Sequence, residues 1–155
     1  MNLENLLEEL KKNRKIKKQV TGLDYLNSTL LAAKRNLQAA QETLDKFEEA
    51  AFKLAYDGLL QISRVVVLLN GYRPIDGEQH KTTFIVAGAI LGENFNNLII
   101  QIDSFRIKRN NCIYDPQIAI TKTEAEILLN TAQKYWKEVR DYLRKKNSQL
   151  ELFEF

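Results

Sequence analysis

The residues best suited to bind an anion lie in one short segment near position 110. Arg106 and Arg109 are followed by Asn110, and Tyr114 stands five residues after Arg109. A guanidinium is planar, keeps its charge at every physiological pH and can donate two parallel hydrogen bonds to a phosphate. The amide and the phenol add neutral hydrogen-bonding groups. These residue types predict a phosphate-binding site in which Arg106, Arg109 and Asn110 hold the anion.

The position of Arg109 within its segment supports this prediction. Apolar side chains recur at intervals of three and four residues over about 94–112, which is typical of the buried face of a helix, and Arg109 occupies one of these apolar positions. An arginine is almost never buried without a partner, because its charge cannot be removed by titration. One alternative is an internal ion pair with Asp57 or Asp103. The others are an anionic ligand or a subunit interface.

The elements that must position this segment are predicted to be helices. Helical apolar patterns cover roughly 2–19, a stripe from Leu30 to Phe47, and about 49–69, 78–91 and 94–112, and the last pattern follows a capping box at Thr121 and Glu124. Glycine or proline stands at most of the breaks, and residues 84–86 form the only run with strand character. We therefore expect an all-α protein: an up-and-down bundle of four to five helices over 21–148, an extra amphipathic, basic N-terminal helix over 1–20, and an apolar tail over 149–155.

Positive charge is concentrated at one place in the chain. The 23 basic residues include six within positions 11–18, which leaves 17 basic against 20 acidic residues elsewhere. The net charge of +3 is therefore local and does not describe a protein-wide field. Such a run either contacts phosphates or forms the solvated end of a helix, and the composition alone favours neither.

The sequence also predicts that the protein has no disulfide, membrane span, metal site or cofactor. Cys112 is the only cysteine, so no disulfide forms within the chain, which fits a reducing compartment. No apolar run approaches the roughly 18 residues of a membrane span, and the N-terminus lacks the pattern of a secretion signal, so we expect a cytoplasmic protein away from the membrane. His80 is the only histidine, and one histidine with one distant cysteine builds no metal site. No cofactor is predicted.

The C-terminal tail is apolar after a polar stretch. Gln149, Leu150, Leu152 and Phe153 resemble the short peptide with which bacterial proteins dock on the DNA sliding clamp. That resemblance predicts an exposed tail and the clamp as a partner. The alternative is a tail that folds back on the bundle or pairs with a second subunit.

Arg106-x-x-Arg109-Asn110-x-x-x-Tyr114-Asp115-Pro116, near the end of a bundle helix, resembles the HEPN superfamily. The upstream elements Ala55-Tyr56-Asp57-Gly58-Leu59, Gly71-Tyr72-Arg73-Pro74 and Gly77-x-x-His80-x-Thr82 are similar to one prokaryotic branch of it, so that the resemblance spans about 28–143. It implies a homodimeric helical bundle that binds RNA or a nucleotide and serves as a toxin or phage-defence component, with a nucleotidyltransferase antitoxin as a partner. Many members of the superfamily are metal-independent ribonucleases.

The resemblance also assigns roles to single residues. Arg109 and Asn110 match the arginine and polar residue of the superfamily's nuclease motif, whereas Tyr114 stands where that motif has histidine. The catalytic candidates are therefore Arg109 and Tyr114, with His80 and Asp57 as accessory residues. A phenol with a pKa of about 10 is a poor proton carrier near neutral pH, so ribonuclease activity is expected to be weak or absent. The alternative function is a non-catalytic, homodimeric protein-interaction module whose arginines serve the interface.

Overall fold

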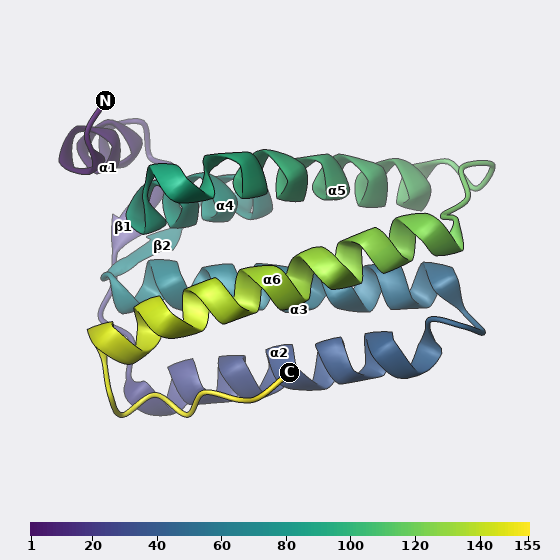
Figure 1. Ribbon diagram of the computed structural model, residues 1–155. Coiled ribbons are helices and arrows are strands. Elements are labelled where there is room, and N and C mark those ends of the chain that lie inside the picture. The colour runs from purple at the N-terminus through teal and green to yellow at the C-terminus, as the bar shows by residue number, and fades with distance from the viewer.

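A computed structural model describes all 155 residues and confirms that the fold is all-α (Figure 1). The six helices are α1 (Leu3–Lys12), α2 (Leu23–Thr43), α3 (Glu48–Leu69), α4 (Gln79–Leu91), α5 (Asn96–Tyr114) and α6 (Lys122–Lys146). A 3-10 turn, η1 (Glu93–Phe95), precedes α5, and two three-residue strands, β1 (Ile16–Lys18) and β2 (Tyr72–Pro74), form the only sheet. No helix combines the length and the apolar character needed to cross a bilayer.

Helix α3 is the centre of the bundle, and buried residues cover a broad arc of its surface. It packs against α2, α4 and α6, and these elements share one core (Figure 1). Its interior polar group is satisfied, because the Ser63 and Tyr135 hydroxyls lie 2.8 Å apart in a hydrogen bond between α3 and α6. The helix ends at Asn70, and Gly71 follows with a φ of +86°, a left-handed conformation that glycine adopts without strain.

A glycine lets α5 approach α4 closely. A Cβ built on Gly88 would lie 2.8 Å from Cγ1 of Ile99, so any larger residue at position 88 would require the Ile99 side chain or the helices to shift. Ile102 and Phe105 of α5 are buried in the core, and α5 lies beside α4 (Figure 1). This packing brings the polar side chains of α5 near the N-terminal end of α4.

The prediction of one helix over 1–20 is wrong, because α1 ends at Lys12. Arg14 has a φ of +57°, and the N–H groups of Arg14 and Lys15 donate to the carbonyls of Lys11 and Leu10. This is a Schellman motif, which closes a helix by satisfying its last carbonyls. The chain then continues as β1, where Ile16 is buried and β1 pairs antiparallel with β2. The basic run therefore lies on a helix end, a turn and a strand.

Two further boundaries differ from the sequence-based prediction. Helix α2 ends at Thr43, and Phe47, expected on its apolar stripe, is 65% exposed in the connection to α3. Helix α5 continues to Tyr114, and Asp115 ends it, as expected for a residue before proline. Residues 84–86 belong to α4, as the predicted helix over about 78–91 requires, so their strand character is overridden by tertiary packing.

The prediction of an exposed apolar tail is also wrong, since residues 149–155 fold back on the bundle (Figure 1). Leu150 and Phe153 are buried, Leu152 is partly buried and Gln149 is exposed. The Phe153 ring stacks on Trp136 with centroids 4.0 Å apart, and the Trp136 indole N–H donates to the Phe153 carbonyl at 2.9 Å. Three of the four side chains that would dock on a sliding clamp, Leu150, Leu152 and Phe153, are therefore occupied within the fold.

Candidate anion-binding site

A polar cavity of about 460 Å³ lies between the start of α4 and the middle of α5. The segment from Asp76 to Lys81 forms one side, and Arg106, Arg109 and Asn110 form the other; none of the lining residues is hydrophobic. Three fixed cations, Lys81, Arg106 and Arg109, therefore border a space large enough for a phosphorylated group. Two acids, Asp76 and Glu78, border it as well.

Arg109 lies at this cavity without an internal ion pair. Its guanidinium carbon is 5.1 Å from the centroid of the Tyr56 ring, which is a cation–π contact. Its Nε is buried and has no hydrogen-bond partner. Of the two carboxylates considered as ion-pair partners, Asp103 accepts from Nε of Arg106 at 2.7 Å, and Asp57 pairs with no cation. A buried donor on a charged group is costly to leave unsatisfied, and the Nε of Arg140 is unsatisfied in the same way. What distinguishes Arg109 is that its side chain also lines the polar cavity.

Tyr56 joins Arg109 to the only histidine. The Tyr56 side chain is fully buried, its ring packs edge-on against Phe84, and its hydroxyl lies 3.2 Å from Nδ1 of His80 in a hydrogen bond. Burial raises the pKa of the Tyr56 phenol, so the hydroxyl stays protonated. This contact fixes the imidazole of His80, which lines the cavity from the first turn of α4.

The electrostatic environment of the site is positive. Burial lowers the pKa of His80 and Arg109 lowers it further. Asp57 opposes them with a smaller effect, and Arg64 and Arg106 lower the pKa by still smaller amounts. Burial also raises the pKa of Asp57, while Arg109 and His80 oppose that rise. Since cations disfavour a second positive charge on His80, an anion entering the cavity would reverse this effect and raise the pKa of His80.

Asp76 provides a second unsatisfied polar atom at the same cavity. Its Oδ2 accepts a hydrogen bond from the Thr82 hydroxyl at 2.7 Å, whereas its Oδ1 is buried and has no partner. Two residues of the cavity lining therefore hold an unsatisfied polar atom, a donor on Arg109 and an acceptor on Asp76. A ligand with both a phosphate and a hydroxyl would complement the pair.

No protein-family model matches the chain, and no curated protein or solved structure matches it.

The structure brings together most of the residues that the sequence predicted for the site. Arg106, Arg109, Asn110 and His80 line the same cavity, and Asp57 is close enough to influence the pKa of His80. Tyr114 does not join them: it is 86% exposed at the end of α5 and lies outside the cavity lining. Five residues along a helix turn the side chain about 140° away from Arg109, which explains the separation.

The sequence did not identify Asp76 and Lys81 as site residues. The Asp76-Gly77 pair directly before a helix is a recognisable turn signal, but its side-chain orientation follows only from the packing of α4. No three His, Cys, Asp or Glu side chains are grouped so that they could hold a metal ion.

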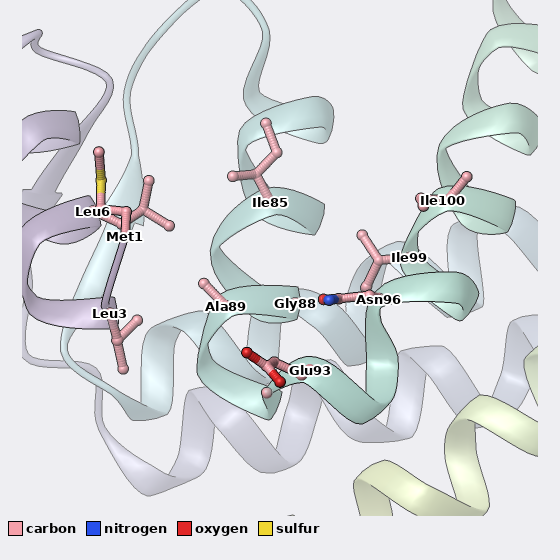
Figure 2. Close-up of a pocket in the computed structure, with 11 residues that line it drawn as sticks. Met1, Leu3, Leu6, Ile85, Gly88, Ala89, Glu93, Asn96, Ile99 and Ile100 are labelled. Carbon is pink, nitrogen blue, oxygen red and sulfur yellow. The ribbon is translucent and has the colours of Figure 1, made fainter.

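A second cavity of about 650 Å³ is mainly apolar and lies between α1, α4 and the start of α5 (Figure 2). Leu3 and Leu6 of α1 border it on one side, Ile85 and Ala89 of α4 form its middle, and Ile99 of α5 lies opposite (Figure 2). Glu93 is the only charged residue of its lining. This cavity offers an apolar contact surface and has no lysine or arginine in its lining, unlike the polar cavity.

Proposed function

We propose that this chain binds a phosphate group of RNA or of a nucleotide in the cavity between α4 and α5. The observation that supports this most strongly is the buried Nε of Arg109, which has no partner within the chain and belongs to a side chain that lines a wholly polar cavity. A phosphate oxygen would accept from it in a charge-assisted hydrogen bond. Lys81 and Arg106 add positive charge, and Asn110 can orient a phosphate or ribose oxygen.

The start of α4 strengthens the same assignment. No side chain caps the N-terminus of this 13-residue helix, and its first residues, Gln79, His80 and Lys81, line the cavity. Free N–H groups at a helix N-terminus, together with the helix dipole, favour a bound anion. The unsatisfied Oδ1 of Asp76 would accept from a ribose hydroxyl, which favours a nucleotide over inorganic phosphate.

Binding with weak or absent cleavage is the form of activity that we propose. Tyr114 stands where the HEPN nuclease motif has histidine. Its phenol points away from Arg109 and lies outside the cavity. The two side chains that would transfer protons in that motif are therefore not brought together within one subunit. A role as a HEPN-like toxin or phage-defence component, with a nucleotidyltransferase as antitoxin, stays a prediction from the resemblance.

The experiment is a titration of the protein with a fluorescently labelled, single-stranded RNA at low salt in the presence of a metal chelator. We expect saturable binding that an unlabelled nucleoside monophosphate competes away, and RNA that is recovered intact. Binding should weaken as salt is added, because phosphate contacts release counterions. An absence of binding at low salt would contradict the proposal.

A second candidate function, a homodimeric interaction module, is supported by the exposed face of α5. Ile100, Ile107 and Tyr114 recur every seven residues on this face and are 69%, 47% and 86% exposed. Ile85 of α4, 41% exposed, lines the apolar cavity together with Ile100 (Figure 2). We propose that a second copy covers this face, since such apolar stripes mark interaction sites.

Sedimentation measures the proposed dimer directly. We expect a species of twice 18.0 kDa at micromolar concentration, and a shift toward 18.0 kDa when Ile100 and Ile107 are both changed to glutamine. The matched control is Ile127→Gln on α6, where an isoleucine of similar exposure, 45%, lies on another helix. A wild-type protein that sediments cleanly at 18.0 kDa would contradict the dimer.

A further inference from the structure

We infer that the bound partner is a single strand of RNA that continues from the cavity onto the β1–β2 ribbon. This inference rests on the proposed phosphate site and extends it. A smaller cavity of about 80 Å³ shares Gln79 and His80 with the first and is also lined by Arg64 and Arg73. His80 therefore lines two cavities that are both bordered by cations, and β2 contributes Arg73 to the smaller one.

The ribbon continues the positive surface beyond Arg73. In the antiparallel register Lys17 pairs with Arg73, and Ile16 pairs with Pro74. Ile16 and Pro74 are buried, so the alternation of a strand places Lys17 and Arg73 together on the outward face, where both are exposed. Lys15, two residues before Lys17, is exposed next to the same ribbon, and its carbonyl accepts from the Ile75 N–H.

The cavity and the ribbon together form a cationic track, and all of its cations except Arg106 are free of acidic partners. Eight ion pairs form in the protein, and seven basic residues take part in them: Lys11, Lys53, Arg106, Lys108, Lys122, Arg140 and Arg144. None of the track's other cations, Lys15, Lys17, Arg64, Arg73, Lys81 and Arg109, is among them. Like charges side by side on neighbouring strands repel each other, and a polyanion would relieve the repulsion.

The shape and chemistry of the track favour single-stranded RNA. One phosphate must enter a cavity to reach the guanidinium of Arg109, and a flexible strand can turn a phosphate inward more readily than a rigid duplex can. The unsatisfied acceptor on Asp76 matches a 2′-hydroxyl, the group by which proteins distinguish RNA from DNA. An anionic membrane surface offers neither a phosphate that reaches inward nor that hydroxyl.

The test compares two double variants that remove the same amount of charge. Lys17→Gln with Arg73→Gln removes two cations of the track, and Lys134→Gln with Lys137→Gln removes two exposed cations of α6 that form no ion pair. The probes are a labelled single-stranded RNA 12-mer and a nucleoside monophosphate, titrated at several salt concentrations.

We expect the track variant to bind the 12-mer more weakly. The slope of log affinity against log salt should become shallower by about 1.4, or about 0.7 for each of two phosphate contacts in a single strand. Binding of the nucleoside monophosphate should be unchanged, because that ligand occupies only the cavity. The α6 variant should behave like the wild type with both probes.

Several outcomes would overturn the inference. Equal salt slopes for the wild type and the track variant would show that the strand does not follow the ribbon, and the phosphate site would then stand alone. Stronger binding to a DNA 12-mer, to an RNA duplex or to vesicles of anionic lipid than to the RNA 12-mer would assign the track to a different partner. If the Arg109→Ala variant still binds both probes as tightly as the wild type, the proposed phosphate site itself is wrong. The ribbon variants cannot produce that result.

Discussion

Deletion of residues 149–155 is expected to lower the free energy of unfolding by about 3–5 kcal/mol, the usual cost of removing a buried aromatic side chain. The deletion uncovers the face of Trp136 that Phe153 stacks on, and it leaves the indole N–H of Trp136 without its acceptor at 2.9 Å. It also exposes core around Leu150. In a domain of this size the melting temperature should fall by roughly 10 °C.

Thermal unfolding of the deletion variant measures this effect, and two point variants locate it. Phe153→Ala should reproduce most of the loss, whereas Glu154→Gln should change little, because its ion pair with Arg140 involves a carboxylate side chain that is 89% exposed. An unchanged melting temperature after deletion would show that the tail does not hold the bundle. Docking of Gln149, Leu150, Leu152 and Phe153 on a sliding clamp would then become the better explanation of the tail.

Replacement of Arg109 by alanine is expected to weaken RNA and nucleotide binding about 10- to 100-fold while leaving stability within about 1 kcal/mol of the wild type. The loss of affinity follows from removing a charge-assisted hydrogen bond to phosphate, worth about 1.5–3 kcal/mol. The small effect on stability follows because the side chain has no ion pair to break. Loss of the contact with Tyr56 is offset by removal of an unsatisfied buried donor and of repulsion toward Arg106.

The matched control for this variant is Arg144→Ala, which removes an arginine that pairs with Asp141 on the exposed surface of α6. It should leave both affinity and stability nearly unchanged. If Arg109→Ala unfolds the protein instead, the arginine is structural, and its cation–π contact with the Tyr56 ring would account for that role. Full binding with a folded Arg109→Ala variant would move the phosphate site elsewhere.

The helices could be predicted from the sequence because their apolar periodicity and their end signals agree. Helix α3 stops at Asn70-Gly71 and α6 begins at a capping box between Thr121 and Glu124, both as expected. The N-terminal region could not be predicted, because Ile16 pairs with Pro74 of β2, which lies 58 positions further along the chain. A local sequence pattern does not indicate such a long-range pairing. Burial of the tail depends in the same way on Trp136, which becomes its stacking partner only once α6 is packed.

The sequence predicts the site residues that lie on one helix, but it cannot predict which residues of other elements pack against them. Arg106, Arg109 and Asn110 lie on one face of α5, so their grouping follows from helical spacing. The meeting of Arg109 with Tyr56, His80 and Asp76 depends on how α3, α4 and α5 pack, and so it appears only in the fold. Tyr114 was assigned to the site by motif position alone, and the turn of the helix carries it to the exposed face.

The titration of His80, followed by NMR as the only histidine resonance, tests the phosphate site most directly. The probe is a ribodinucleoside monophosphate, whose single phosphodiester keeps its charge across the pH range used. In the free protein the pKa of His80 should lie below its ordinary value of 6.5, because burial and Arg109 disfavour the charged imidazolium. The neutral imidazole then stabilises the fold above that ordinary value, and this contribution is lost as pH falls through the lowered pKa.

With saturating probe the pKa of His80 should rise, since an anion in the cavity stabilises the imidazolium, and by linkage the probe should bind more tightly as pH falls through this range. In the Arg109→Ala variant the pKa of the free protein should be higher than in the wild type, and the probe should shift it little. Identical His80 titration curves with and without saturating probe, while the probe still binds, would show that the phosphate lies elsewhere and would contradict the proposed site.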